Sequence, residues 1–303
     1  MSSLADLGNL KGRRAVVVGG GGGIGRAVTL ALVGEGVTVA VADKNAAALE
    51  ETAGSVAAAG VRIVSAVADV RDSSQLSAFY DLVDMEFPSL DILINVAGGV
   101  RRRPFMETTS EQRDEDIRLN YGYVLDSIQR AVPIMRRGAR GGSIVNFTTI
   151  EAQRGAAGFS VYAGAKAALR NFTRALAVEL GHERIRVNCI APDSTPSAGN
   201  RNALAAETIA ELERLPAEVH AAGVRMAIPM EEAVPEQQLA NAALFLASDL
   251  SAYITGASLP VDGGTSASLG FVNWPFGDGP LPIPLAGTYR RLFADGKNGR
   301  DGE

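Results

Sequence analysis

Residues 15–25 read AVVVGGGGGIG, a short apolar run that leads into five consecutive glycines. The run at 15–18 predicts a buried strand, and the apolar pattern that starts at Ile24 predicts a helix. Glycine lets the backbone turn tightly and approach a pyrophosphate, whose charge then meets the free N–H groups at the start of the helix. Glycine runs also occur in flexible loops, but this position between a strand and a helix favours a dinucleotide-binding turn.

Strand-like and helix-like segments alternate from this turn to about residue 265. The predicted strands cover residues 15–18, 37–42, 63–67, 91–95, 143–147, 185–190 and 258–261. The predicted helices cover residues 24–33, 46–59, 75–85, 115–135, 163–180 and 236–247. This alternation predicts right-handed βαβ units and an α/β fold with a doubly wound parallel sheet, covered by helices on both faces. We expect a single domain over residues 8–266 and a C-terminal extension over residues 267–303.

The composition is typical of a globular chain with a modest negative charge. Of the 303 residues, 47% are hydrophobic and 21% are charged, and the formal net charge is -5. These values predict a sizeable core and disfavour a surface that binds nucleic acid or an anionic membrane. No apolar run resembles a signal peptide or reaches the roughly 18 residues of a membrane-spanning helix, so we expect a cytoplasmic protein. One cysteine, Cys189, and two scattered histidines predict no internal disulfide and no metal site.

Acidic or amide residues end the next three predicted strands. Asp43 ends the second strand, where a carboxylate can accept hydrogen bonds from an adenosine ribose and repel the extra phosphate of NADP. We therefore favour NAD, although Lys44 partly offsets that repulsion; the alternative for Asp43 is an ordinary turn residue. Asp69 ends the third strand and Asn95 the fourth. Ligands of open α/β sheets bind outside the carboxyl ends of the strands, so we expect these residues to share one crevice with the glycine turn.

Tyr162 and Lys166 are four residues apart in the sequence YAGAK, and on a helix they share one face. A free tyrosine has a pKa of about 10, and a nearby cation lowers it toward the range useful for acid–base catalysis. Taken alone, such a pair is usually an ordinary surface pair. Here Thr149 follows the preceding strand, where its hydroxyl could hold a substrate oxygen near Tyr162. Asn120 lies in the long predicted helix before that strand, either as an ordinary polar residue or as a bridge to Lys166 through water.

These motifs, in this order, resemble the compact, single-domain branch of the short-chain dehydrogenase/reductase family over residues 8–266. The glycine motif of the family, Thr-Gly-x-x-x-Gly-x-Gly, is matched by residues 18–25. Its Asn-Asn-Ala-Gly motif is matched by residues 95–98, its Tyr-x-x-x-Lys motif by residues 162–166, and its last strand by residues 253–264. The resemblance implies a Rossmann-type fold and an oxidoreductase that moves a hydride between a nicotinamide cofactor and a secondary alcohol or ketone.

The resemblance also implies roles for single residues. Tyr162 would be the general acid–base, and Lys166 would bind the nicotinamide ribose and lower the pKa of Tyr162. Asn120 would support a proton relay, and Thr149, rather than Thr148, would take the place of the catalytic serine of the family. The residues expected to contact NAD are Gly19, Gly23, Ile24, Gly25, Asp43, Asp69, Val70, Asn95, Ala97, Gly98, Tyr162, Lys166, Pro192 and Thr195.

Four positions depart from the family pattern. Thr149 adds a methyl group and a stiffer χ1 to the catalytic hydroxyl. Val18 lacks a hydroxyl that would help to fix the glycine turn, and Val96 replaces the second asparagine of its motif. Pro192-Asp193 stands where the family usually has Pro-Gly, beside the nicotinamide, so we expect the nicotinamide pocket to differ there.

Two further segments bear on the substrate. The resemblance implies a mobile substrate lid at residues 193–232, whose apolar positions within 203–222 either cover an apolar ligand or pack on the domain. The basic run 101–103 either attracts an anionic substrate or forms a solvated turn. Relatives are commonly tetramers, so a homotetramer is expected, with a dimer as the alternative and the extension packed on a neighbouring subunit or a cleft.

Three other functions are less well supported by these residues. An NADPH-dependent ketone reductase of biosynthesis is favoured by Lys44 and disfavoured by Asp43. A non-catalytic nucleotide sensor would have no use for the Tyr162 and Lys166 pair. A sugar-nucleotide epimerase is disfavoured by the glycine spacing and by the lack of a larger C-terminal substrate domain. We therefore expect a small alcohol or ketone as the binding partner, and neither nucleic acid nor a membrane.

Overall fold

A parallel sheet forms the centre of the structure, a computed structural model that describes residues 7–58, 60–193, 195, 210, 214, 217–268, 271–273 and 280–282. Its seven strands lie in the order β3-β2-β1-β4-β5-β6-β7, and every neighbouring pair is parallel. The strands are β1 (Arg14–Val18), β2 (Thr38–Asp43), β3 (Val64–Val67), β4 (Ile92–Asn95), β5 (Gly142–Phe147), β6 (Ile185–Pro192) and β7 (Ser258–Val261). The predicted doubly wound sheet is confirmed, and no strand boundary differs from its predicted position by more than two residues.

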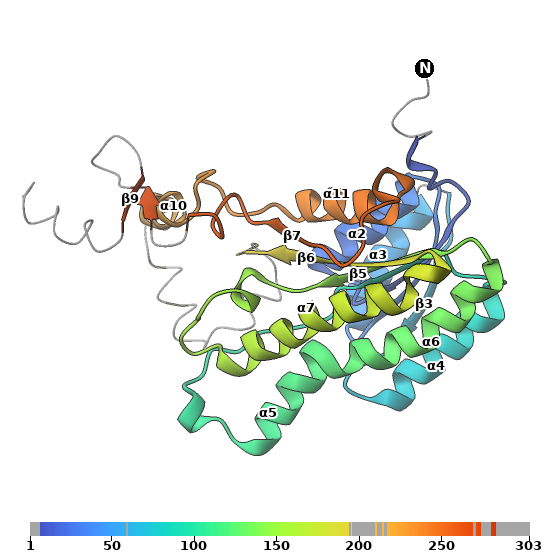
Figure 1. Cartoon of the computed structure of the whole chain (residues 1–303), viewed down its shortest axis with the longest axis horizontal. Helices are drawn as coiled ribbons and strands as arrows, with labels where there is room; N and C mark the ends of the chain where they lie inside the picture. The colour runs from blue at the N-terminus through green and yellow to red at the C-terminus, as the bar shows by residue number, and fades with distance from the viewer. Residues whose placement is uncertain are drawn as a thin grey trace, which may run out of the picture.

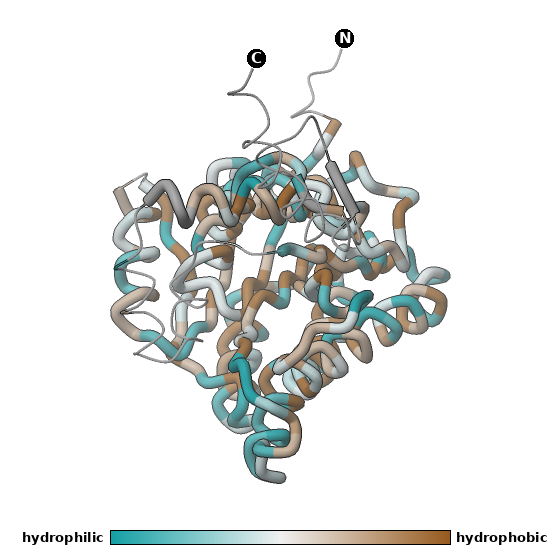
Figure 2. Tube along the Cα trace, turned by 90° about the vertical axis from the view of Figure 1, so that its left-hand side faces the viewer, coloured by the Kyte–Doolittle hydropathy of each residue, from teal (hydrophilic) through white to brown (hydrophobic). Residues whose placement is uncertain are grey.

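Helices connect the strands and cover both faces of the sheet. They are α2 (Gly23–Gly34), α3 (Ala46–Ala58), α4 (Ser73–Glu86), α5 (Ser110–Ile117), α6 (Tyr123–Gly138), α7 (Ser160–Leu180), α10 (Ala217–Ala227) and α11 (Glu236–Ala247). In Figure 1, α11 lies above the sheet, and α7, α6 and α4 lie below it. Figure 2 shows the hydrophobic segments concentrated in the interior of the molecule. Among the described residues, no helix combines the length and the hydropathy needed to cross a membrane.

The first strand shows how its apolar run produces two cores. Successive side chains of a strand point to opposite faces of a sheet. Val16 and Val18 therefore pack with the core side chains of α4, α6 and α7, whereas Ala15 and Val17 pack with those of α2, α3 and α11. All four are fully buried. A strand that is covered on both faces reads as a continuous apolar run, which is why its sequence predicted a central strand.

The prediction of one continuous helix over residues 115–135 is wrong in the middle of that range. The chain instead forms α5, then a π-helical turn over Arg118–Gly122, and then α6. The amide of Asn120 gives a local reason, because its Nδ2 donates to the carbonyl of Asp116 at 2.9 Å. A side chain that bonds to the carbonyl four residues back competes with the regular helical bond. Such turns often mark functional sites, and this one carries a predicted site residue.

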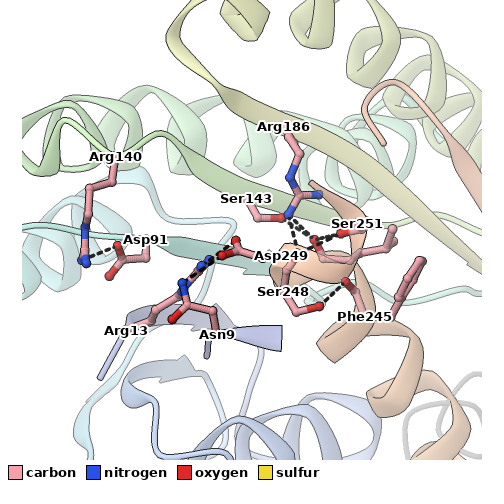
Figure 3. A network of polar contacts seen from close by, with 11 residues as sticks. Asn9, Arg13, Asp91, Arg140, Ser143, Arg186, Phe245, Ser248, Asp249 and Ser251 are labelled. Carbon is pink, nitrogen blue, oxygen red and sulfur yellow. Dashed lines mark hydrogen bonds and ion pairs between the residues drawn. The ribbon is translucent and has the colours of Figure 1, made fainter. Parts of the chain in front are cut away.

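A polar network joins the amino ends of several strands to the end of α11 (Figure 3). Arg186, at the start of β6, donates to the carbonyls of Leu246 at 2.8 Å and Ser248 at 3.1 Å. Cations bind the unpaired carbonyls at a helix C-terminus favourably. Asp249, just after α11, binds Arg13 before β1 at 2.6 Å. These contacts stabilise the amino edge of the sheet, and none of them involves the carboxyl edge.

Two segments that the sequence singled out fall partly outside the described residues. Of the predicted lid, the structure describes α10 and its surroundings, while residues 196–209 and most of 211–216 lie outside. Of the extension, it describes 267–268 and an antiparallel pair, β8 (Phe271–Asn273) and β9 (Pro280–Pro282). Asn273 donates to the carbonyl of Arg225 at 2.9 Å, so this part of the extension packs on α10 of its own chain. Whether the extension also reaches another subunit stays a prediction.

Candidate active site

The glycine turn connects β1 to α2 at the carboxyl edge of the sheet. Gly19 has a φ of +86°, and a Cβ at this position would lie 2.5 Å from the backbone nitrogen of Ala97. A Cβ at Gly25 would lie 1.8 Å from the carbonyl oxygen of Gly19. The helix α2 follows Gly22, which supplies no side-chain cap for the first N–H groups of the helix. Free N–H groups at a helix start bind anions, so this turn fits the pyrophosphate of a dinucleotide.

Two buried hydroxyls fix the carbonyls of this turn. Thr29 donates to the carbonyls of Gly20 at 3.3 Å and Gly25 at 2.9 Å. Thr52 in α3 donates to the carbonyl of Gly21 at 2.9 Å. Neither threonine was predicted from the sequence, although polar residues at inward positions of two predicted helices are a signal. They hold the turn in a chain whose Val18 lacks the hydroxyl usual in the family.

The structure places Asp43 directly against the glycine turn. One carboxylate oxygen accepts the N–H of Gly21 at 2.9 Å, and the other accepts the N–H of Asn45 at 3.0 Å. Each ionised oxygen can accept a further hydrogen bond, so Asp43 can still receive ribose hydroxyls. Asp43 therefore shapes the glycine turn, and its contact with the ribose of a cofactor stays a prediction.

Asp69 and Val70, at the end of the third strand, are less available than the sequence suggested. The Asp69 carboxylate binds the Arg71 guanidinium at 2.6 Å. The hydrogen bond from Arg71 lowers the pKa of Asp69 below its ordinary value, against the effect of burial. Val70 is buried in the core. The contacts of this pair with NAD stay a prediction.

The side chain of Asn95 is part of a buried network between β4, β5 and α6. Its Nδ2 donates to Asn146 at 2.9 Å, and its Oδ1 accepts the hydroxyl of Ser127 at 2.7 Å. Two residues further on, the carbonyl of Ala97 accepts the hydroxyl of Tyr123 at 2.7 Å. These bonds shape the loop after β4, which leads to Gly98. A direct contact between Asn95 and NAD stays a prediction.

Tyr162 and Lys166 lie one turn apart on α7, as their spacing predicted. The Lys166 ammonium is buried and donates to the carbonyl of Phe147, the last residue of β5, at 2.8 Å. Burial lowers the pKa of Lys166 to about 8. Burial also raises the pKa of Tyr162 to about 12, and a hydrogen bond with Thr149 opposes this rise. The structure thus brings together the three side chains expected to handle the proton.

Asn120 joins this group from the π-helical turn. It is fully buried, and its Oδ1 accepts the N–H of Gly99 at 3.2 Å while its Nδ2 donates to the carbonyl of the same residue at 2.9 Å. A Cβ on Gly98 would lie 3.2 Å from Asn120 Oδ1 and 3.3 Å from Lys166 Nζ. Asn120 and Lys166 therefore flank the same glycine. The water bridge between them stays a prediction.

Charged residues that the sequence analysis missed surround the Thr149 hydroxyl. This hydroxyl donates to one oxygen of Glu151, and Arg154 donates to the other at 2.9 Å. Asp193, after β6, lies 3.9 Å from Arg154. Asp193, which stands where the family usually has glycine, therefore forms an ion pair with Arg154. Thr195 is buried, and its hydroxyl donates to the carbonyl of Asp193 at 3.3 Å.

The basic run after β4 is only partly a solvated turn. Arg101 and Arg102 are exposed, but the backbone N–H of Arg103 donates to the carbonyl of Gly158 at 2.8 Å. The Arg103 guanidinium also lies 3.9 Å from Asp116, whose pKa is raised by burial. Arg103 therefore ties this loop to the segment before α7. Within the described part of the chain, no cluster of three or more His, Cys, Asp or Glu side chains is arranged to hold a metal ion.

Comparisons with known proteins agree with this geometry. Residues 19–266 match the family model described as Enoyl-(Acyl carrier protein) reductase. An uncharacterized oxidoreductase of Mycobacterium tuberculosis is 31% identical over 93% of this chain and 99% of its own length. A 3-oxoacyl-[acyl-carrier-protein] reductase of Chlamydia trachomatis is 32% identical over 85% of this chain and 98% of its own.

A solved structure is similar throughout the same region. Carveol dehydrogenase from Mycobacterium avium, in complex with NAD, has a TM-score of 0.78 and 30% identity, over 85% of this chain and 99% of its own. The chain therefore belongs to the short-chain dehydrogenase/reductase family of oxidoreductases, which use nicotinamide cofactors.

Proposed function

We propose that this protein is an NAD-dependent oxidoreductase that interconverts a secondary alcohol and its ketone. The observation that carries the proposal is the buried Lys166 ammonium one helical turn from Tyr162, with Asn120 and the Thr149 hydroxyl beside them. Buried groups with perturbed pKa values that converge at the carboxyl edge of a parallel sheet favour an acid–base site over a structural one.

The bound cofactor would supply the hydride acceptor or donor of the reaction. In oxidation, Thr149 holds the substrate oxygen, and Tyr162 accepts the proton that leaves this oxygen as the hydride leaves the adjacent carbon. The Lys166 cation favours the Tyr162 phenolate over the neutral phenol. Asn120 shapes the loop at Gly99, so that Gly98 lies against Lys166. In reduction the same residues act in reverse, with Tyr162 as the proton donor.

The preference for NAD rests on Asp43. Its carboxylate is anchored by two backbone N–H groups, so it cannot turn away to make room for a ribose phosphate without loss of both bonds. The complex of carveol dehydrogenase with NAD supports this choice. The second candidate is an NADPH-dependent ketone reductase, which is favoured by Lys44 and by the similarity to 3-oxoacyl-[acyl-carrier-protein] reductases.

A side-by-side titration of the protein with NADH and NADPH, followed by nicotinamide fluorescence, tests the cofactor. Tighter binding of NADH supports the proposal and leads to a screen of secondary alcohols with NAD. Tighter binding of NADPH would favour the ketone reductase. Failure to bind either one would refute both. Tyr162→Phe is the matched control in the screen, because it removes only the phenolic oxygen.

The proposal also covers the assembly and layout of the chain. We propose a homotetramer in the cytoplasm, one catalytic domain over residues 8–266, and a substrate lid within residues 193–232. Light scattering on the full chain and on a form ending at residue 267 tests the assembly and the role of the extension. Identical masses, stabilities and kinetics for the two forms would show that the extension is dispensable.

A further inference from the structure

The hydroxyl of Thr149 makes a hydrogen bond within the protein. A threonine hydroxyl has one proton to donate and two lone pairs, and here the proton is donated to Glu151. One lone pair accepts the backbone N–H of Glu151 at 3.4 Å. Thr149 therefore presents its remaining lone pair, rather than a proton, to the space beside Tyr162. A substrate oxygen that gains negative charge during oxidation is stabilised by a donated proton, so the bond to Glu151 competes with this task.

Glu151 belongs to a line of three charged side chains that runs through Arg154 to Asp193, just after β6. Arg154 neutralises it from one side at 2.9 Å, and Asp193 lies 3.9 Å from the same guanidinium. The side chains of Glu151 and Asp193 are only 18% and 12% exposed. Charges in such positions are less screened by water than charges on the surface. The three side chains together carry one negative charge beside the catalytic hydroxyl.

We infer that Glu151 is a positioning residue that withholds the Thr149 proton from the substrate oxygen and, with Arg154 and Asp193, sets the pH range in which Tyr162 accepts the substrate proton. The inference rests on the proposed function. In the step concerned, the O–H bond of the alcohol breaks and its proton moves to the Tyr162 oxygen. Thr149 assists when its hydroxyl turns from Glu151 to the substrate oxygen.

The negative charge of Glu151 affects the pKa of Tyr162. A carboxylate disfavours the phenolate of a neighbouring tyrosine, and the pKa of Tyr162 is indeed raised first by its burial and further by Glu151. Lys166, one turn further along the same helix, carries the opposite charge. The elements packed on α7 carry further charges. They include Arg154 and Asp193, which pair with each other, Asp116, which pairs with Arg103, and the charged side chains of α5 and of the π-helical turn, Glu111, Arg113, Asp114, Glu115 and Arg118.

Two substitutions with opposite expected effects test the inference. Glu151→Gln removes the negative charge, so the acid limb of kcat/KM for NAD-linked alcohol oxidation should move to lower pH by about one unit. Arg154→Gln leaves Glu151 without its cation, so the same limb should move to higher pH. Glu179→Gln is the matched control, since it removes the same charge from an exposed position near the end of α7 and should leave the profile in place.

A merely structural role would give a different result. If Glu151 only stabilised the turn after β5, both substitutions would lower the melting temperature or kcat without moving the pH profile. Profiles of Glu151→Gln and Arg154→Gln that coincide with the control, or that move in the same direction, would overturn the inference.

A second readout separates this inference from the proposed function. If the unmodified protein bound neither nicotinamide nucleotide, the proposed function would fail, but the ionisation of Tyr162 can still be followed by ultraviolet absorbance. Subtraction of the matching Tyr162→Phe protein isolates the signal of this tyrosine. Ionisation should begin at lower pH in Glu151→Gln than in the parent. An unchanged onset would refute the influence of Glu151.

Discussion

Replacement of Lys166 by methionine tests whether burial holds this ammonium in an unfavourable state. The side chain is 3% exposed, and its pKa falls from 10.5 to about 8 because of burial. A gap of about 2.5 pKa units at 1.36 kcal/mol per unit corresponds to about 3 kcal/mol. The folded chain releases this proton at a lower pH than the unfolded chain. Stability should therefore rise as pH increases from about 8 to 10.5, and Lys166→Met should lack this contribution.

Urea unfolding of both proteins, below pH 8 and again near pH 10.5, measures the effect. The free energy of unfolding of the parent, minus that of Lys166→Met, should increase by about 3 kcal/mol between the two conditions. Because all other titrating groups are shared, their contributions cancel in this difference. Equal pH dependence of the two proteins would refute the assignment of a strongly perturbed, buried ammonium. The variant should also bind NADH less tightly and lose turnover, since Lys166 serves both tasks.

Three further substitutions test other parts of the molecule. Tyr162→Phe should lower kcat by about 10²- to 10⁴-fold, because the acid–base group is lost, while fluorescence titration finds almost unchanged NADH affinity; near-normal turnover would exclude Tyr162 as that group. Asp43→Ala should weaken NADH binding by about tenfold and narrow its advantage over NADPH, since roughly 1–2 kcal/mol of charge-assisted hydrogen bonding is removed; an unchanged ratio of the two affinities would count against Asp43 as the selector. Arg186→Leu should reduce the free energy of unfolding in urea by about 2–4 kcal/mol, because buried carbonyls lose a charged donor, and leave kcat/KM intact; a loss of catalysis at full stability would contradict a purely structural role.

Much of the fold could be predicted from local sequence signals, because the tertiary contacts agree with them. The apolar run before the glycines is buried on both faces of the sheet, and this burial is the reason for its pattern. Asp43 was predicted at the end of a strand, and the structure places it there, where its carboxylate accepts the N–H of Gly21 in the glycine turn. Tyr162 and Lys166 were placed on one helix face by spacing alone, and the structure keeps them there.

Other features lack any local signal. The hydrogen bonds of Asn95 run to residues 32 and 51 positions away. No short motif could therefore predict that this amide bonds within the core. Glu151 and Arg154 follow a strand end, where charged residues are usually solvated, and only the fold reveals that Asp193 lies beside Arg154. The chain is helical on both sides of Asn120, and no local signal marks the π-helical turn between α5 and α6.

The π-helical turn makes this stretch of the chain sensitive to its length as well as to residue identity. A π-turn holds more residues than an α-turn, and each residue of a helix rotates the next by about 100°. Two side chains contact the loop after β4: Asn120, within the π-helical turn, and Tyr123, the first residue of α6. Loss of a single residue between them would close the turn and rotate one contact away while the other stayed. A one-residue deletion in this stretch is therefore expected to disturb the loop after β4 even when Asn120 and Tyr123 are both kept.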